Sequence, residues 1–291
     1  MNLSLFVQCL VNGIMIGGVY ALVASGFTLI LGVMKIFNFA QGQFYMLGAF
    51  VAYGVAVSLG LPYVVALIIS ILSMGLLGVL VYIGIIKWTY SGFFQTVMAT
   101  FAFSTIAKQG SLLTFGYREK VLPAVVRGII EVSNVTVPGG KLFIIFVAIL
   151  VMVSLHYFLK LKVGTSMRAV AESMDVASLQ GINPTRIFYL TMGIGCGLSG
   201  IAGGLIAPVF CASVLMGERI FIMALLVVAI GGMGSMTGAL LASCVIGVVE
   251  SFAYQFVGEL NLVAIFILLA VIIYFRPGGL MGKPLPIPTA E

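Results

Sequence analysis

Stretches of about twenty apolar residues recur along the chain and constrain its fold more than any other feature. A helix of that length is about 30 Å long, which is enough to cross the hydrocarbon of a bilayer. The apolar stretches span residues 5–33, 40–59, 62–86, 94–115, 141–161, 187–210, 219–256 and 260–275. Only 8% of the residues are charged, against about 25% in a soluble domain. The sequence therefore predicts one all-α polytopic membrane domain over residues 1–291, with about eight to nine transmembrane or re-entrant helices.

Two of these stretches, 5–33 and 219–256, are too long for one straight crossing. Each contains a glycine cluster: Gly13, Gly17 and Gly18 in the first, and Gly231, Gly232 and Gly234 in the second. Backbone that leaves helical geometry inside a membrane must be covered by protein or line a water-filled path. We therefore expect a broken or re-entrant helix in both stretches.

The distribution of Lys and Arg predicts the orientation, because cytoplasmic loops carry an excess of these residues. If the segments around Lys35, Lys87, 160–186 and 276–283 are cytoplasmic, that side holds eight Lys and Arg residues and the other side holds five. The external charges are then Arg118, Lys120, Arg127, Lys141 and Arg219, together with Glu119, Glu131, Glu218 and Glu259. The loop 117–140 is then external. The net charge of +6 fits basic cytoplasmic loops in a lipid-embedded protein, and no basic-aromatic patch indicates a nucleic-acid partner.

Residues 164–187, GTSMRAVAESMDVASLQGINPTRI, form a short charged segment between two apolar stretches. Thr165 or Ser166 can cap a helix start, Gly181 can end that helix, and Asn183 can cap the next one. Apolar side chains at helical spacing form one stripe and charged ones the opposite stripe: Met167, Val170, Met174 and Ala177 against Arg168, Glu172 and Asp175. We expect a cytoplasmic amphipathic helix of about three to four turns, which either lies on lipid headgroups or docks into a groove on a cytoplasmic protein.

Within this segment, MRAVAESMDVASLQGINPTRI resembles the cytoplasmic coupling loop of permeases from the branched-chain amino-acid ABC transporter family. Three further blocks resemble the same family: GGVYALVASGFTLILGVMKIFNFAQGQFYMLGAF at 17–50, GGMGSMTGALLASCVIGVVES at 231–251 and FRPGGLMG at 275–282. The resemblance extends over nearly the whole chain. It implies a permease subunit of an importer in the bacterial or archaeal cytoplasmic (inner) membrane.

The resemblance also implies partners: a second related permease that forms a heterodimer, two cytoplasmic ATPase subunits and an extracytoplasmic substrate-binding protein. In such a complex, the segment 164–187 is the coupling helix that transmits closure of the ATPases to the membrane helices. The residues assigned to coupling are Arg168, Ala169, Glu172, Asp175, Gly181, Ile182 and Asn183. No G-x-x-x-x-G-K-[ST] motif occurs, so we expect the partners to hydrolyse ATP, and this chain to have no catalytic residue, cofactor or metal of its own.

Polar residues inside the apolar stretches are candidates for the substrate pathway, because intramembrane charges usually face a cavity or a partner. Lys108 lies about 12 Å from the external end of its stretch, which is too deep for easy snorkelling. It either contacts a substrate carboxylate or forms a structural pair, with Glu250 as the other deep charge. The remaining candidates are Asn12, Tyr20, Asn38, Gln41, Gln43 and Tyr45. Those in NFAQGQFY either satisfy freed backbone groups or line the path near a gate.

Small residues recur along one side of the stretch 187–210 and predict close helix packing. They are Gly193, Gly197, Gly200 and Gly204. The same region matches G-x-G-x-x-G, but it lies in an apolar stretch with no strand before it, which argues against a dinucleotide site. Ser199 in a G-x-S-G sequence and the only histidine, His156, are expected at different membrane depths, which argues against a serine protease.

The main alternative is an ion-coupled secondary transporter of amino acids or organic acids, which would also use broken helices. Such a transporter usually needs deep acidic or histidine side chains, and only Glu250 qualifies. It would not need a docking helix. The expected substrate is a branched-chain amino acid or a related small carboxylate or amide.

Overall fold

The computed structural model describes residues 3–281, except residues 91, 124–128, 133–134 and 277. Its long helices are α1 (Leu3–Met34), α2 (Gln41–Tyr53), α3 (Tyr63–Val81), α5 (Phe93–Phe115), α6 (Gly139–Lys160), α7 (Lys162–Glu172), α9 (Pro184–Phe210), α10 (Met216–Gly231), α11 (Met236–Val257) and α12 (Asn261–Phe275). Shorter elements are α4 (Lys87–Thr89), α8 (Met174–Leu179), the π-helical turns Gly54–Ser58 and Tyr82–Ile86, the 3-10 turn Gly258–Leu260, and an antiparallel hairpin of β1 (Ile129–Val132) and β2 (Val135–Pro138).

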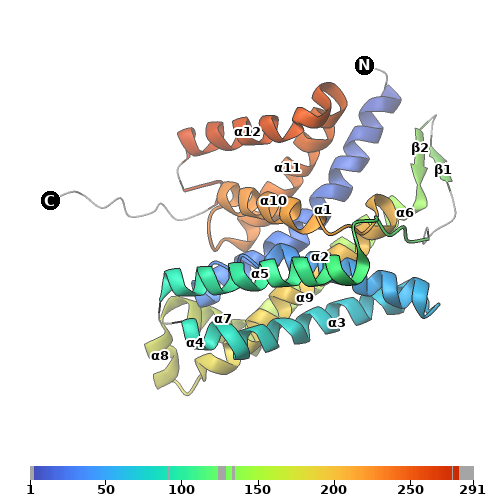
Figure 1. Cartoon of the computed structure of the whole chain (residues 1–291). Coiled ribbons are helices and arrows are strands. Elements are labelled where there is room, and N and C mark those ends of the chain that lie inside the picture. The colour runs from blue at the N-terminus through green and yellow to red at the C-terminus, as the bar shows by residue number, and fades with distance from the viewer. Residues whose placement is uncertain (1–2, 91, 124–128, 133–134, 277, 282–291) are drawn as a thin grey trace.

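The helices form a bundle with two distinct ends (Figure 1). The β1–β2 hairpin and the start of α1 lie at one end, which is called the hairpin end, and α8 lies at the other, the α8 end. Among the residues that the structure describes, five helical segments are long and apolar enough to cross a membrane: Ser4–Met34, Tyr63–Thr89, Gly139–Lys160, Pro184–Phe210 and Met236–Val257. The structure is therefore an all-α polytopic membrane fold, as predicted, with one small hairpin that the sequence did not predict.

Helix α1 lies at the centre of the bundle and is continuous over its whole length. The predicted break in 5–33 is wrong. Its glycines serve instead as contact points: Gly13 and Gly17 lie against the backbone of α11, and Gly26 lies against Gly195 of α9. A residue without a side chain lets two helix backbones approach closely, so these glycines strengthen packing rather than interrupt the helix.

The predicted break in 219–256 is confirmed at residues 232–235, between α10 and α11. Gly232 and Gly234 adopt φ values of +98° and +82°, which favour glycine. Ser235 caps α11 by accepting a hydrogen bond from Gly238 N at 3.1 Å. Residues 278–281 cover the freed backbone, since Leu280 N donates to Ile230 O at 2.7 Å and Met281 N to Gly231 O at 3.1 Å. These contacts bring together two sequence blocks separated by α12.

The small residues of α9 face α3 along one side. A side chain added at any of the four positions would meet α3: Gly193 lies beside Val79, Gly197 beside Ile71, Gly200 beside Met74 and Gly204 beside Leu67. On another side of α9, Gly203 packs against the carbonyl oxygen of Tyr45 in α2. α9 is thus held between neighbours that approach its backbone closely.

This packing predicts a large penalty for adding one methyl group at Gly203. In Gly203→Ala, the new Cβ would overlap the carbonyl oxygen of Tyr45, so we expect a loss of stability of about 1–3 kcal/mol. Thermal unfolding of the purified protein in detergent measures it. Gly84→Ala is the matched control, because nothing lies within 4 Å of a Cβ at Gly84. Equal unfolding midpoints for the two variants would contradict the packing.

Candidate transport pathway and docking segment

A cavity of about 860 Å³ lies toward the hairpin end, between α1, α2, α6, α9, α10 and α11. Four of the predicted pathway residues line it: Asn12, Tyr20, Tyr45 and Glu250. Its other polar walls include Lys141, Ser213, Arg219, Ser251 and Asn261, and its apolar walls include Met15, Ile16, Val19, Ile206, Val209 and Ile220. A mainly apolar chamber with a few polar groups is typical of a small-molecule site.

The central feature of this cavity is the carboxylate of Glu250. It accepts hydrogen bonds from Tyr20 Oη at 2.5 Å, Arg219 Nη2 at 2.9 Å and Asn261 Nδ2 at 3.4 Å. The Glu250 side chain is only 4% exposed, whereas that of Arg219 is 60% exposed. A buried carboxylate must be paired and hydrogen-bonded to remain charged. The network meets this need and ties α1, α10, α11 and α12 together.

A second polar contact joins α1 and α6 in the wall of the cavity. Lys141 Nζ, at the start of α6, donates to Asn12 Oδ1 of α1 at 2.6 Å. Together with Arg219, Lys141 gives the cavity two cationic side chains and one carboxylate. Because the carboxylate is already paired with Arg219, the lining has an excess of positive charge.

The predicted residues of NFAQGQFY divide between two places. Tyr45 lines the cavity, but Asn38, Gln41 and Gln43 are buried in the protein interior. Gln41 Nε2 donates to Gly195 O at 2.9 Å and to Ser199 Oγ at 2.6 Å, which fixes the start of α2 against α9. Asn38 Oδ1 accepts from Ala40 N at 3.1 Å. The contact of Asn38 fits the structural interpretation, in which side chains satisfy freed backbone groups, whereas Gln41 bonds to a carbonyl oxygen inside the continuous helix α9.

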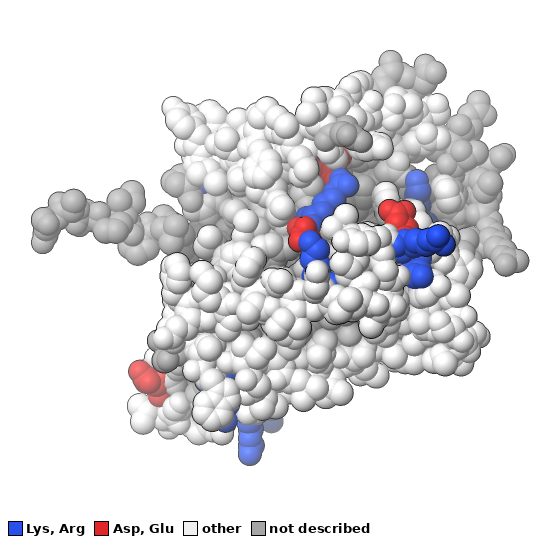
Figure 2. Space-filling view, viewed as in Figure 1, with Lys and Arg blue, Asp and Glu red and all other residues white. Residues whose placement is uncertain are grey.

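The suggested pairing of Lys108 with Glu250 is wrong. Lys108 Nζ of α5 lies 2.5 Å from Glu218 Oε1 in the first turn of α10. The two side chains are 29% and 55% exposed, so the pair lies on the outer surface of the bundle and not in its interior. Figure 2 shows acidic and basic atoms together near the middle of one face and a second such group to the right of it, on a surface that is otherwise mostly uncharged.

The segment 164–187 forms two helices and not the single helix that the pattern predicted. Ser173 has extended backbone, with φ of −154° and ψ of 119°, and separates α7 from α8. Its hydroxyl caps α8 by accepting from Val176 N at 3.4 Å. The predicted caps Thr165 and Ser166 instead lie inside α7, where their hydroxyls donate to backbone carbonyls one turn earlier.

The end of the segment follows the local prediction. Gly181 has a φ of +80°, as a C-terminal glycine cap requires. Asn183 Oδ1 accepts from Thr185 N at 3.0 Å and from Arg186 N at 3.4 Å, and Pro184 occupies the first turn of α9. Met167, Val170 and Ala177 are buried against the bundle.

The outer surface of the segment is both charged and apolar. The predicted coupling residues Arg168, Glu172, Asp175, Gly181 and Asn183 are exposed, and Ala169 and Ile182 are half-buried. Two apolar side chains also project outward: Val176 is 54% exposed and Leu179 is 88% exposed. An exposed leucine among charged residues at the tip of a short helix is suited to insertion into a groove on another protein.

The segment is also connected to the bundle. Tyr90 Oη donates to Met34 O, at the end of α1, at 3.1 Å, and lies 3.8 Å from the sulfur of Met174 in α8. Partial burial raises the pKa of the Tyr90 phenol, so it remains a protonated donor at neutral pH. α8 therefore contacts Tyr90, and the Tyr90 hydroxyl is hydrogen-bonded to the end of α1.

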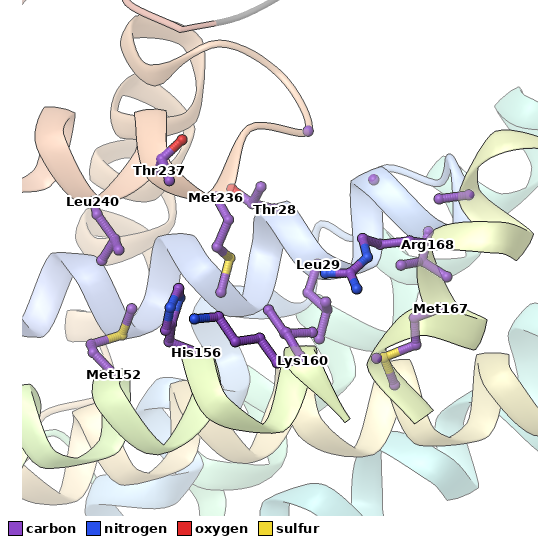
Figure 3. A pocket seen from close by; sticks show the side chains of 16 residues that line it. Thr28, Leu29, Met152, His156, Lys160, Met167, Arg168, Met236, Thr237 and Leu240 are labelled. Atoms are coloured by element: carbon purple, nitrogen blue, oxygen red, sulfur yellow. The ribbon is translucent and has the colours of Figure 1, made fainter. Parts of the chain in front are cut away.

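A smaller cavity of about 330 Å³ separates α7 from α11 at the α8 end (Figure 3). His156 and Lys160 of α6 project into it near Met236, and Arg168 of α7 lies at its other side near Leu29. His156 thus lines this cavity, whereas Ser199 is buried and bonded to Gln41. Within the described residues, no group of three or more His, Cys, Asp or Glu side chains could hold a metal ion.

Sequence reasoning missed four residues of these sites: Arg219, Glu218, Asn261 and Lys141. We placed Arg219, Glu218 and Lys141 among external loop charges. The available signal was Glu218-Arg219 at the edge of a long apolar stretch, because adjacent charges there need partners from other helices.

The apolar helices, the internal cavity and the intramembrane charge network define a multi-pass membrane transport protein. The family model for branched-chain amino acid transport system permease components matches residues 9–275. The chain belongs to that family.

Curated relatives agree with this assignment. The chain is 29% identical to the high-affinity branched-chain amino acid transport system permease protein BraD of Pseudomonas aeruginosa, and 27% identical to LivH of Escherichia coli, over 96% of each chain in both comparisons. It is also 27% identical to LivM of Salmonella typhimurium over 51% of this chain and 36% of LivM. No solved structure matches the chain significantly.

The Glu250 network predicts a graded response to mutation. Tyr20→Phe removes one hydrogen bond to a charged group, so we expect a loss of about 1.5–3 kcal/mol. Glu250→Ala leaves Arg219, Tyr20 and Asn261 without their acceptor, and we expect about 3–5 kcal/mol. Thermal unfolding of the purified variants in detergent measures both losses of stability. Glu218→Ala is the control, because its ion pair is exposed and worth about 0–1 kcal/mol. A Glu250→Ala protein as stable as Glu218→Ala would contradict the network.

Proposed function

We propose that this chain is a permease subunit of an ABC importer that carries branched-chain amino acids across the cytoplasmic membrane. The observation that carries the proposal is the hairpin-end cavity. Its cationic side chains, Arg219 and Lys141, suit the carboxylate of an amino acid, and a guanidinium retains further N–H donors after pairing with one carboxylate oxygen. Its apolar walls, such as Val19 and Ile206, suit a branched aliphatic side chain.

Energy is supplied by separate ATPase subunits that bind the α7–α8 segment. The exposed Leu179 and Val176 give this segment an apolar anchor, and Glu172 and Asp175 surround it with charge. With the ATPases bound there, the α8 end is the cytoplasmic one, and the excess of Lys and Arg on that side supports this orientation. The hairpin end then faces an extracytoplasmic binding protein, which delivers the substrate to the cavity.

A second permease completes the transport unit. In Salmonella typhimurium, the related proteins LivH and LivM are both named permease proteins of a high-affinity branched-chain amino acid transport system. The chain is similar to both, over different shares of its length, which supports a partner of related sequence. This chain itself binds no nucleotide, cofactor or metal, and it is a transport subunit rather than an enzyme.

Substrate and energy source are tested together by uptake. A native host that lacks this gene should lose ATP-dependent uptake of radiolabelled leucine, isoleucine and valine at low external concentration, and the gene on a plasmid should restore it. In proteoliposomes of the purified complex, uptake should need ATP and not a proton or sodium gradient. Uptake driven by an ion gradient alone would favour the secondary transporter.

The docking role predicts the effect of a charge at Leu179. Leu179→Asp should reduce the amount of ATPase that copurifies with the permease about tenfold or more, because loss of an interface anchor typically costs at least about 2 kcal/mol. Mass spectrometry of affinity-purified complexes in mild detergent measures this. Tyr117→Asp is the control, because Tyr117 is 82% exposed but lies near the hairpin end. Equal ATPase capture by both variants would exclude α8 as the anchor.

A further inference from the structure

The cavity between α7 and α11 at the α8 end collects basic side chains that no acidic group neutralises. His156 and Lys160 lie one helical turn apart on α6 and project into it from one side, and Arg168 of α7 lies at the other (Figure 3). Among the described residues that line the cavity, none is acidic. The ion pairs in the described part of the chain lie elsewhere, so neither Lys160 nor Arg168 has a carboxylate partner there. The cavity therefore carries a net positive charge.

The start of α11 brings backbone donors to the same cavity. Met236 and Thr237 form the first turn of this helix, and both residues line the cavity across from His156 (Figure 3). Their N–H groups have no acceptor among the residues that the structure describes. The first turn of a helix carries a partial positive charge, and its free N–H groups bind anions. The start of α11 thus adds to the attraction that the basic side chains exert on an anion.

Thr28 of α1 adds a hydroxyl that has no partner. This residue lines the cavity, its side chain lies close to Met236 in Figure 3, and it is only 2% exposed. Its Oγ1 is buried and makes no hydrogen bond within the described structure. A helical hydroxyl usually donates to the carbonyl one turn earlier, as those of Thr165 and Ser166 do in α7. Because a buried polar group without a partner is costly, the hydroxyl of Thr28 points to an acceptor on a ligand.

The remaining lining is apolar, and the cavity lies near the membrane surface. Leu29 and Val33 of α1, Leu159 of α6 and Leu240 of α11 all contribute to its walls. Thr28 is six residues, about 9 Å, before the end of α1, which puts the deepest polar group less than two turns below that end. Donors for an anion beside apolar walls at this depth suit an amphiphile, with its charged group among the donors and its hydrocarbon along the walls.

We propose that this cavity binds the phosphate group of an anionic phospholipid from the leaflet at the α8 end. Arg168 and Lys160 supply charged donors, the start of α11 supplies N–H groups, and the hydroxyl of Thr28 donates to a remaining phosphate oxygen. The acyl chains lie along the apolar walls. A lipid held in this way joins the α7–α8 segment to α11, the helix that carries Glu250. The site uses neither the transported substrate nor an ATPase, so it does not depend on the proposed function.

Binding is tested on the full-length chain, delipidated in detergent, by its thermal unfolding midpoint. We expect phosphatidylglycerol to raise the midpoint more than phosphatidylcholine, which has no net charge, and inorganic phosphate to leave it unchanged. Lys160→Gln should need about tenfold more phosphatidylglycerol for half of the full shift, because a hydrogen bond to a charged group is lost. Lys162→Gln is the matched control and should behave as the wild type, since Lys162 is exposed two residues away but does not line the cavity.

Three results would overturn this site. Equal shifts with phosphatidylglycerol and phosphatidylcholine would mean that the negative charge of the lipid is not recognised. An equal shift with inorganic phosphate would make the occupant a soluble anion and not a lipid. Equal weakening by Lys160→Gln and Lys162→Gln would mean diffuse attraction to the basic surface and no defined cavity. None of these results bears on leucine uptake or ATPase capture, which test the proposed function separately.

The variant Thr28→Val tests the position of the phosphate inside the cavity. Valine has nearly the shape of threonine but no hydroxyl, so the lipid-free variant should unfold at the same temperature as the wild type or higher, because an unsatisfied group has been removed. Its half-shift concentration of phosphatidylglycerol should nevertheless rise severalfold, since the phosphate loses a donor. Unchanged lipid affinity in a folded Thr28→Val protein would show that the phosphate does not reach Thr28 and would overturn its placement in this cavity.

Discussion

The close contact of α1 with α9 and α11 is the constraint on which the rest of the structure depends. Glycines on each of the three helices let their backbones approach, as at Gly26 and Gly195. This packing fixes Tyr20 of α1 beside Glu250 of α11, and hence the position of the polar network. It also fixes the end of α1, where Met34 accepts the hydrogen bond of Tyr90. The cavity and the docking segment are thus attached to the same central helix.

Charge is distributed according to what surrounds it. Glu250 is buried and accepts hydrogen bonds from three donors. Glu218, in α10, is about half exposed and pairs with one cation, Lys108. Arg219 and Glu218 are adjacent in α10, but Arg219 pairs with Glu250 in the cavity and Glu218 pairs with Lys108 on the outer surface. The first turn of α10 therefore connects the interior cavity to the outer face. A movement of α10 would change both together, which suits a helix at a pathway that opens and closes.

Local signals in the sequence predicted much of the helix architecture and part of the docking segment. The glycine-rich break before α11, the cap by Asn183 and the left-handed Gly181 depend on residues within one or two turns, and the structure has all of them. The break at Ser173 was missed because Ser173 itself fits an amphipathic helix, and its competing role as a cap became visible only in three dimensions. Asn12, Tyr20, Tyr45 and Glu250 were found as polar residues in apolar stretches, but their grouping in one cavity was not.

Hydropathy and turn chemistry act over short distances along the chain, so the residues alone predicted a helical membrane protein, and the resemblance of four sequence blocks added the permease family. Which glycines break a helix and which let two helices pack closely became clear from the folded arrangement. Gly13 lies in a continuous helix with the backbone of α11 beside it, whereas Gly232 has a positive φ at the point where the chain turns between α10 and α11. Only the tertiary structure decided that Lys108 pairs with Glu218 and that Arg219 reaches Glu250. Such pairings depend on which helices are neighbours, and the order of apolar stretches does not specify this.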